Sequence, residues 1–495
     1  MNIKADTVSI PLKHDMKKHL SDRFGHDVST LYFIGIGGSS MSGLAKISLE
    51  QGFHVEGSDQ VNSKYTELLS SRGATVHIGQ KRENIHPGID LVVYTAAIHP
   101  DNPEMVAADE LNIPKVERAD YLGLLSEIFP KTIGVAGTHG KTTTSSMIAT
   151  LLHFADFDPS VSIGGNIPVF GSNAELGDSD YFVIESCEYV DSFLKTTHEI
   201  GIITNIEEDH LDYFKGGMEQ IKASFHKFGA ILPPEGLMIA YGDSQNVRDV
   251  VKGLRCKVTT YGFSDQNDWV AKNITYDHNG NPAFDAYYKG DFDGHYVLRI
   301  PGRHNVLNAL ACIACAKFLN IDVPIIEKTL DHFSGAKRRF EFRGQVDGIN
   351  VYEDYAHHPT ELKVVIDACM HHDHNRLWVV YQPHSYSRIY YLFDEFVDSF
   401  NQVDKLIISE IYSNRETNEW DIFPEDLAKR IKQRHHVPTV VISEFEDITK
   451  FLTDNLEKGD LVLVAGAGNI NKVAYMLVDA LREKYPDAPY KLPED

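Results

Sequence analysis

The sequence has 495 residues, and its content of 42% apolar and 24% charged residues is typical of a chain that folds around large cores, in about two to four domains. Its 47 basic and 71 acidic side chains give a formal charge of −24, which argues against nucleic acid or an anionic membrane as a general partner. No apolar run reaches membrane-spanning length, the polar start of the chain does not resemble a secretory signal, and the cysteines are few and scattered, so we expect a cytoplasmic protein.

The first domain is expected to follow a polar lead-in, residues 1–29, to which we assign no chemistry. It begins with an apolar strand over residues 30–34 that runs into the loop Gly35-Ile36-Gly37-Gly38-Ser39-Ser40-Met41-Ser42-Gly43 and a helix. Strands at residues 53–57, 75–78, 90–95 and 115–117, with helices between them, predict a parallel, doubly wound sheet.

This glycine-rich loop resembles the G-x-G-x-x-G fingerprint of dinucleotide binding, except that Ser40 takes the place of the third glycine. Asp59, at the end of the second expected strand, stands about where a ribose-binding acid would lie. The pattern fits NAD, another nucleotide diphosphate or a turn without a ligand, and the residues alone leave these three open.

The second domain opens on an apolar strand that ends in Gly137-Thr138-His139-Gly140-Lys141-Thr142-Thr143-Thr144, followed by a helical pattern. Backbone N–H groups, the positive end of the helix and Lys141 can hold a polyanion, and a threonine hydroxyl can reach Mg²⁺. The spacing departs from G-x-x-x-x-G-K-[ST], because the first glycine falls at Gly137 instead of Val135. We favour a phosphate site over a strand–helix turn without a ligand.

Polar residues follow two further expected strands of this domain, residues 180–184 and 200–204. Because the carboxyl ends of parallel strands share one edge, we expect Glu185, Asn205, Asp209 and His210 to meet the loop that carries Lys141. A threonine hydroxyl with Glu185 would suit Mg²⁺, and a solvated strand end is the alternative for Glu185. His210 fits a second metal site or a γ-phosphate contact, or a histidine bonded to backbone.

Residues 256–300 are rich in aromatics and in Asn-Gly and Asp-Gly turns, which predicts a hairpin-rich insertion. In the helical pattern that resumes at Gly302, Asn305 and Asn308 share a face and fit adenine recognition or helix capping equally well. Cys312 and Cys315 lie in an apolar helical run, so we expect buried small residues and not a redox pair.

A third α/β domain is expected after Phe333-Ser334-Gly335, with strands at residues 349–352, 377–381, 405–409, 439–442 and 460–465. Two of these strands end in polar residues that include His357, His358 and Arg388, where a ligand would bind. Adjacent histidines point in different directions, so without a third ligand we do not expect a zinc site here.

As a set, these motifs resemble those of the Mur ligases of peptidoglycan synthesis, over nearly the whole chain from Leu31 onward. The motifs are G-T-H-G-K-T-T-T, the strand ending in Glu185, T-N-I-E-E-D-H-L-D, G-R-H-N-V-L-N, R-R-F-E and D-Y-A-H-H-P-T-E. The first glycine-rich loop, A-I-H-P-D-N-P-E (residues 97–104) and Q-P-H-S-Y-S-R (residues 382–388) resemble the branch that adds L-alanine to UDP-N-acetylmuramate.

The resemblance implies an α/β fold of three domains after the extension 1–29. They are a Rossmann-like domain for the UDP substrate (residues 30–130), a central P-loop ATPase-type domain (residues 131–335) and a Rossmann-like C-terminal domain for the amino acid (residues 336–495). It also implies that ATP, with Mg²⁺, phosphorylates the lactyl carboxylate of UDP-N-acetylmuramate, and that the amine of L-alanine attacks the acyl phosphate. We expect a monomer or homodimer.

Site residues are carried over by position from the resemblance. For ATP they are Gly137, Thr138, His139, Gly140, Lys141, Thr142, Thr143, Asn305, Asn308, Arg339 and Asp354, and for the metal Thr142, Glu185 and His210. For the UDP substrate they are Gly35, Gly37, Gly38, Ser39, Ser40, Met41, Ser42, Asp59 and Asn102, and for L-alanine Tyr355, His357 and Arg388. Catalytic roles fall to Lys141, His210, His357 and Arg388.

Two departures from the family pattern stand out: Ser385 replaces an arginine found in many members, and E-S-C-E replaces the commoner E-A-D-E after the strand that ends at Glu185. The nearest alternative function is that of the recycling ligase of the same family, which attaches a preformed tripeptide. An alternative of another class is a nucleotide-sensing or NAD-binding protein without ligase activity.

Overall fold

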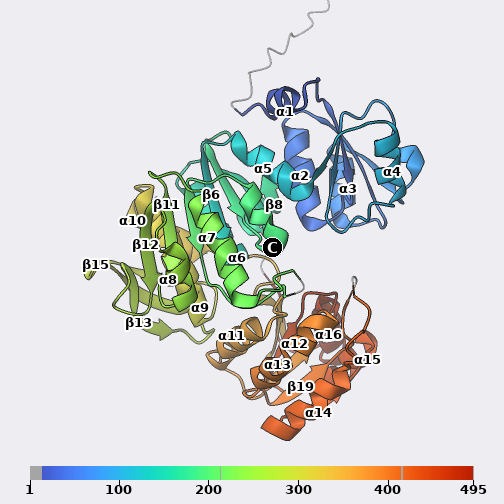
Figure 1. Cartoon of the computed structure of the whole chain (residues 1–495). Helices are drawn as coiled ribbons and strands as arrows, with labels where there is room; N and C mark the ends of the chain where they lie inside the picture. The colour runs from blue at the N-terminus through green and yellow to red at the C-terminus, as the bar shows by residue number, and fades with distance from the viewer. Residues whose placement is uncertain (1–13, 212, 414–415, 494–495) are drawn as a thin grey trace, which may run out of the picture. The chain divides into compact units, whose positions relative to one another are not determined.

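The computed structural model describes residues 14–211, 213–413 and 416–493 (Figure 1). The chain forms two compact units, Met1–Asn267 with Ala311–Ile325, and Asp268–Leu310 with Ile326–Asp495. Residues 1–13 of the polar lead-in lie outside the described residues, and the expected domain boundaries at residues 30, 131 and 336 stay a prediction.

The first unit begins with a parallel sheet in the order β3-β2-β1-β4-β5, which confirms the parallel pairing expected from alternating strands and helices. Its strands are β1 (Thr30–Ile34), β2 (His54–Asp59), β3 (Thr75–Ile78), β4 (Leu91–Tyr94) and β5 (Lys115–Glu117). Its helices are α1 (Met16–Phe24), α2 (Ser39–Glu50), α3 (Lys64–Ser71), the 3₁₀ turn η1 (Arg82–Asn84), α4 (Pro103–Glu110) and α5 (Arg118–Glu127).

Helix α1, in the lead-in, is part of the core of this first sheet. Met16 and Leu20 are buried in one apolar cluster with Leu31 and Phe33 of β1. Asp15 caps the helix by accepting a hydrogen bond from the Lys18 N–H at 3.0 Å. Helix α1 in the lead-in therefore packs against the first sheet as part of its hydrophobic core.

The second sheet of this unit has the strand order β12-β11-β10-β6-β9-β7-β8, and all neighbours whose register is described are parallel except β7 and β8. Its strands are β6 (Lys131–Ala136), β7 (Ser160–Ile167), β8 (Ser172–Glu175), β9 (Tyr181–Glu185), β10 (Ile200–Ile203), β11 (Leu237–Tyr241) and β12 (Lys257–Gly262). The helices are α6 (Lys141–Phe154), η2 (Pro168–Phe170), η3 (Tyr189–Lys195), α7 (Gly217–Ala230) and α8 (Gln245–Val251). The carboxyl ends of β10, β6 and β9 are thus neighbours at one edge.

Helix α2 of the first sheet lies beside strand β8 of the second (Figure 1). A Cβ atom at Gly43 would lie 2.9 Å from the Cβ of Ala174, so the two backbones approach closely there. Lys46, which is buried, donates to the Ala174 carbonyl at 2.9 Å and pairs with Glu175 at 2.7 Å. These contacts join the glycine-rich loop at the start of α2 to the second sheet.

The second unit contains the antiparallel strands β13 (Trp269–Tyr276), β14 (Pro282–Tyr288) and β15 (Asp291–Val297), which confirm the hairpin-rich insertion. Helices α9 (Arg303–Phe318) and α10 (Val323–His332) each contribute residues to both units. Cys312 and Cys315 are buried and free in α9, as expected for small core residues.

The remaining sheet of the second unit has the order β20-β19-β18-β21-β17-β16-β22. Its strands are β16 (Glu341–Val346), β17 (Ile349–Asp354), β18 (Leu377–Tyr381), β19 (Lys405–Ile408), β20 (Thr439–Val441), β21 (Leu461–Ala465) and β22 (Tyr490–Lys491). Its helices are α11 (Pro359–Met370), α12 (Tyr386–Tyr391), α13 (Phe393–Ser399), α14 (Pro424–His435), α15 (Phe445–Asn455) and α16 (Asn471–Lys484).

Both faces of this sheet are buried, as in a doubly wound α/β domain. Along β21, Leu463 and Ala465 belong to one apolar cluster, whereas Val462 and Val464 belong to another. The alternation follows the two-residue period of a strand, so each face packs against its own layer of helices.

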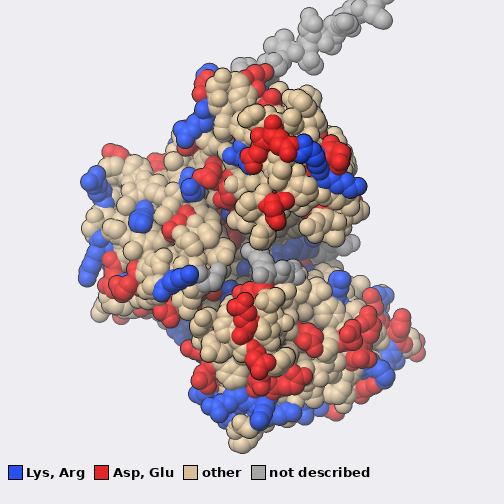
Figure 2. Space-filling view, turned by 45° about the vertical axis from the view of Figure 1, so that its right-hand side comes forward, with Lys and Arg blue, Asp and Glu red and all other residues tan. Residues whose placement is uncertain are grey.

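Acidic and basic side chains are both scattered over the face of the molecule that Figure 2 shows. Among the residues that the structure describes, no helix combines the length and the apolar character needed to cross a membrane.

Candidate active site

The loop between β6 and α6 has a backbone that requires its two glycines. Gly137 has φ 141° and Gly140 has φ 82°, both in the region that favours glycine. A Cβ atom at Gly137 would lie 2.0 Å from the Thr204 hydroxyl oxygen. The irregular spacing of the motif therefore reflects a close approach between this loop and the end of β10.

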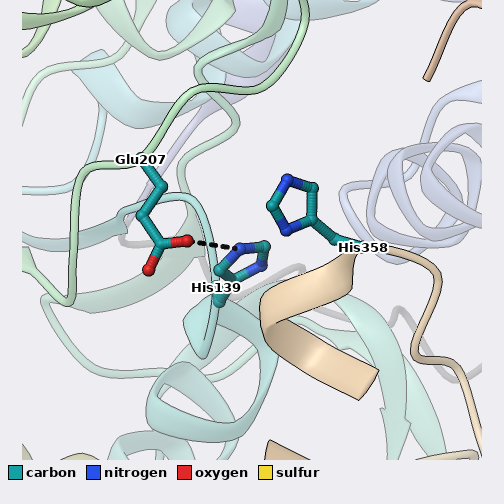
Figure 3. Close-up of side chains that lie close together, drawn as sticks. All are labelled: His139, Glu207 and His358. Atoms are coloured by element: carbon teal, nitrogen blue, oxygen red, sulfur yellow. Dashed lines mark ion pairs between the residues drawn. The ribbon is translucent and has the colours of Figure 1, made fainter. Parts of the chain in front are cut away.

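The segment after β10 holds the loop in place. The His139 N–H donates to Asn205 Oδ1 at 2.8 Å, and Asn205 Nδ2 donates back to the His139 carbonyl at 3.0 Å. The Glu207 N–H donates to the Thr138 hydroxyl at 2.9 Å, and His139 Nε2 lies 3.6 Å from Glu207 Oε2 (Figure 3). The expectation that Asn205 meets the loop is confirmed, and its role is to fix the backbone.

Lys141, at the start of α6, points back into its own loop. Its Nζ donates to the carbonyl of Gly137 and, at 3.0 Å, to that of Thr138. It also pairs with the buried carboxylate of Glu188, at 3.1 Å from Oε1 and 3.0 Å from Oε2. Burial is the largest single influence and would lower the pKa of Lys141, but the charge and hydrogen bond of Glu188 together with the nearby charge of Glu185 and the Cys187 side chain outweigh it and raise the pKa above its ordinary value. The ammonium group is therefore charged.

Thr142 and Glu185 form the second polar pair of the loop. The Thr142 hydroxyl donates to Glu185 Oε1 at 3.0 Å, and the Gly164 N–H donates to Glu185 Oε2 at 2.7 Å. A hydroxyl and a carboxylate at the N-terminus of a helix are oxygen ligands of the kind that Mg²⁺ prefers beside phosphates. The donor set fits this cation, and the expected contact between Glu185 and the loop is confirmed.

His210 packs against Tyr189. Its ring centroid is 4.6 Å from that of Tyr189, and its Nε2 is 3.7 Å from Asp209 Oδ2. Its φ of 55° places a non-glycine residue in the left-handed region, where strain gathers at functional sites. Because Tyr189 directly follows Glu188, one short turn contacts both Lys141 and His210.

The glycine-rich loop of the first sheet is held by Asp59, whose Oδ2 accepts from the Gly37 N–H at 2.9 Å. Ser39 donates to the Gly164 carbonyl at 3.3 Å, and the Arg118 guanidinium lies 3.4 Å from the Ser40 hydroxyl. The Gly38 N–H donates to the Gly35 carbonyl at 3.1 Å to close the turn, and Met41 and Ser42 are buried behind it. Ser39 and Glu185 thus both contact Gly164.

Asn102, the other expected substrate residue, caps helix α4. Its Oδ1 accepts from the Glu104 N–H at 2.9 Å, and its Nδ2 donates to Gln80 at 2.7 Å. The fully buried Glu104 then accepts hydrogen bonds from Tyr32 at 2.8 Å and Ser58 at 2.5 Å, which ties α4 to strands β1 and β2.

In the second unit, His357 and Arg388 meet around His384, a residue that the sequence pattern did not single out. Arg388 Nη1 lies 3.2 Å from His384 Nδ1, and the rings of His357 and His384 are 5.6 Å apart. His357 Nδ1 lies 3.0 Å from the Tyr355 carbonyl, which can only accept, so this nitrogen carries the proton. Burial lowers the pKa of His357 to about 3, and the charge of Arg388 adds to the effect. The ring is therefore neutral, and its Nε2 is a hydrogen-bond acceptor.

Tyr355 lies between this cluster and two arginines. The guanidinium groups of Arg338 and Arg339 stand 4.8 Å and 5.3 Å from the centre of its ring. Asp354 accepts from the N–H groups of Phe340 and Ala356 at 2.7 Å and 2.6 Å, and burial raises its pKa to about 6. Asp354 thus anchors the turn that presents Tyr355.

Asn305 and Asn308 lie on one face of α9, as expected, and both are buried. Asn305 donates to the Pro301 carbonyl at 2.7 Å, and Asn308 donates to Asn305 Oδ1 at 3.0 Å. The first of these bonds fixes the start of the helix. Recognition of adenine by the pair stays a prediction.

The architecture and the loop define a class of protein: a multidomain α/β chain built around a glycine-lysine-threonine phosphate-binding loop. The chain belongs to the Mur ligase family, because three family models match it in succession: "Mur ligase family, catalytic domain" over residues 30–129, "Mur ligase middle domain" over residues 135–316 and "Mur ligase, glutamate ligase domain" over residues 338–468.

Individual relatives agree with this assignment. The chain is 45% identical, over 90% of its length and 96% of the relative's, to the UDP-N-acetylmuramate–L-alanine ligase of Caldanaerobacter subterraneus. The crystal structure of UDP-N-acetylmuramate-alanine ligase from Thermotoga maritima shares the fold, with a TM-score of 0.79 and 24% identity over 92% of this chain and 99% of that one. MurF ligase from the same organism, solved in complex with ADP, has a TM-score of 0.61 and 17% identity over 87% and 96%.

Proposed function

We propose that this chain catalyses the ATP-dependent ligation of L-alanine to the lactyl carboxylate of UDP-N-acetylmuramate, in the cytoplasm. The observation that carries the proposal is the 45% identity, over 90% of the chain, to a protein named for that reaction. The site supports it, because Lys141 and Thr142 follow a glycine loop suited to a nucleotide triphosphate, and Glu185 at the end of β9 contacts Thr142.

The reaction needs ATP because a carboxylate is a poor acylating agent. Transfer of the γ-phosphoryl group to one carboxylate oxygen makes that oxygen part of a good leaving group. The L-alanine amine then attacks the carbonyl carbon, the carbon–oxygen bond to the phosphate breaks, and the amide, ADP and inorganic phosphate result. The chain has to hold three reactants and neutralise charge during phosphoryl transfer.

Residues of the first unit would bind the nucleotide and the carboxylate substrate. We assign Lys141 to the β- and γ-phosphate oxygens, with the N–H groups of the loop and the N-terminus of α6 around them. Thr142 and Glu185 would hold Mg²⁺, which draws negative charge from the phosphates when bound. Ser39 and the loop that Asp59 supports would bind the UDP part of the substrate, and Gly164 contacts both Ser39 and Glu185.

Residues of the second unit would bind the amino acid. Arg388 supplies a planar cation for the carboxylate of L-alanine. The Nε2 of the neutral His357 would accept a hydrogen bond from the amine and orient it for attack, because a histidine with a pKa of about 3 is too weak a base to store the proton. Tyr355, whose ring is approached by the guanidinium groups of Arg338 and Arg339, would line the methyl group.

Phosphate release with UDP-N-acetylmuramate, ATP and Mg²⁺ tests the proposal. L-Alanine should support release, with glycine and L-serine weaker. Release only with the preformed tripeptide would assign the chain to the recycling reaction instead. No release with any acceptor, together with tight ATP binding, would favour a nucleotide sensor without ligase activity.

A further inference from the structure

A carboxylate that the proposed reaction does not use is paired with the lysine of the phosphate loop. Glu188 is only 3% exposed, and both of its oxygens lie within salt-bridge distance of Lys141 Nζ, at 3.1 Å and 3.0 Å. The Lys141 side chain is itself 14% exposed. In this arrangement the ammonium group spends its hydrogen bonds on Glu188 and on the carbonyls of its own loop.

The turn that carries Glu188 is fixed from several sides. Val190 and Asp191 both have left-handed backbones, with φ 49° and 56°, which is uncommon for residues other than glycine. Tyr213 donates to Asp191 Oδ2 at 2.8 Å, and the Ser224 hydroxyl donates to its other oxygen. A strained turn persists only where its surroundings over-determine it, so the position of Glu188 is imposed by the fold.

The charges of the loop have a consequence for nucleotide binding. One cation, Lys141, stands beside two carboxylates, Glu185 and Glu188, so the side chains of the cradle carry a net negative charge. A polyphosphate without a metal ion meets this charge and must also separate Lys141 from Glu188. A polyphosphate that arrives with a divalent cation brings the positive charge that offsets both carboxylates.

We propose that Glu188 is a positioning residue that holds Lys141 away from the phosphate space and thereby makes nucleotide binding depend on Mg²⁺. This inference rests on the proposed nucleotide site. It assigns Glu188 a specificity role: free phosphate, pyrophosphate and metal-free nucleotide are excluded, and only the metal complex displaces Glu188 from Lys141.

Nucleotide titrations in EDTA and in saturating Mg²⁺ test the inference, with binding of ATP to the full chain measured calorimetrically in the absence of other substrates. For Glu188→Gln we expect about a tenfold or greater gain in affinity for metal-free ATP, because one opposing charge is lost. The ratio of the ATP affinity in Mg²⁺ to that in EDTA should become correspondingly smaller. Glu188→Asp keeps the charge and should stay close to wild type in this ratio.

Glu175→Gln is the matched control. It also removes one carboxylate from an ion pair with a buried lysine, Lys46, in the same unit and away from the loop. It should leave both affinities unchanged. In a Lys141→Met background, Glu188→Gln should raise the affinity for metal-free ATP by a smaller factor, because only the opposing charge is lost and there is no lysine to release.

Unchanged metal-free affinity in Glu188→Gln would overturn the inference, and so would weaker binding of Mg²⁺-ATP with no gain in EDTA, since that result would make Glu188 a metal ligand. If Glu188→Gln does not fold, the test uses Glu188→Asp and the ratio of its ATP affinity in Mg²⁺ to that in EDTA. A ratio well above the wild-type value contradicts the proposed pairing. If wild type itself does not bind Mg²⁺-ATP, the proposed nucleotide site fails instead.

Discussion

Gly164 and Glu185 are joined by a hydrogen bond of 2.7 Å in which a backbone N–H of β7 fixes the carboxylate at the end of β9. The other oxygen of Glu185 accepts from Thr142 at 3.0 Å. The Gly164 carbonyl in turn accepts from Ser39, in the loop proposed to bind the UDP substrate. One glycine therefore contacts both the proposed metal ligand and the proposed substrate loop.

Gly164→Ala should impair the metal site without removing a ligand. An ideal Cβ atom at Gly164 would lie 2.9 Å from Glu185 Oε2, so the carboxylate has to shift and its contact with Thr142 is disturbed. We expect the Mg²⁺ concentration for half-maximal activity to rise several-fold, while the melting temperature of the free protein changes little. The measurement is a Mg²⁺ titration of phosphate release at saturating ATP. An unchanged titration would show that Glu185 does not need this position.

Lys141→Ala should abolish turnover, by about a thousandfold or more, because no other cation of the loop can neutralise the transferring phosphoryl group. The control is Lys195→Ala, which removes a more exposed lysine paired with Asp120 in the same unit. Circular dichroism and melting temperature check that both variants fold. Near-normal turnover of Lys141→Ala would remove the loop from the mechanism.

Arg388→Ala should act mainly on the amino acid. Loss of a charge-assisted contact to a carboxylate predicts a rise of about tenfold to a hundredfold in the KM for L-alanine, with a smaller effect on the KM for ATP. Arg430→Ala, on the half-exposed face of α14 in the same unit, is the control and should keep both values. If the KM for L-alanine is unchanged, another group holds the carboxylate.

Acid should destabilise the first unit through His198. Burial lowers the pKa of His198 to about 4, against 6.5 for an ordinary histidine, and its ring packs 4.3 Å from that of Phe228. Between these pH values the unfolded chain binds a proton that the folded chain does not. The neutral His198 therefore contributes fully to the free energy of unfolding above about pH 6.5. About 3 kcal/mol of this contribution is lost as the pH falls to about 4.

The test is the melting temperature from pH 7 to pH 4.5. The melting temperature of His198→Leu should fall less steeply with decreasing pH than that of wild type. Part of the pH dependence should remain, because other buried histidines also have lowered pKa values. His54→Leu, at an exposed position on β2, is the control and should follow wild type. Equal slopes for His198→Leu and wild type would exclude this histidine as a source of acid sensitivity.

Much of the fold could be predicted because its strands are apolar runs that end in glycine or polar residues. β1, β3, β5 and β18 begin and end where the sequence indicated. β7 and β8 were missed, because S-V-S-I-G-G-N-I contains two glycines and S-N-A-E lacks β-forming residues. Both depend on pairing within the sheet and on packing against α2, which a local pattern does not encode.

The loop and its immediate partners were also predictable, since Glu185 and Asn205 follow strands that neighbour β6. Glu188 was not, because its contact with Lys141 depends on the path of the chain after β9, which has left-handed residues at Val190 and Asp191. The signal in the sequence was a second acid three residues after Glu185. His384 was missed for a similar reason: its place beside Arg388 depends on how the end of β18 turns into α12.

The most direct test of the proposed reaction follows one oxygen atom. UDP-N-acetylmuramate labelled with oxygen-18 in its lactyl carboxylate is incubated with ATP, Mg²⁺, L-alanine and the protein, and the released phosphate is analysed by mass spectrometry. Attack on an acyl phosphate transfers one labelled oxygen to each inorganic phosphate, together with formation of the alanyl amide. Phosphate without label, or labelled product only when the tripeptide replaces L-alanine, would contradict the proposed function.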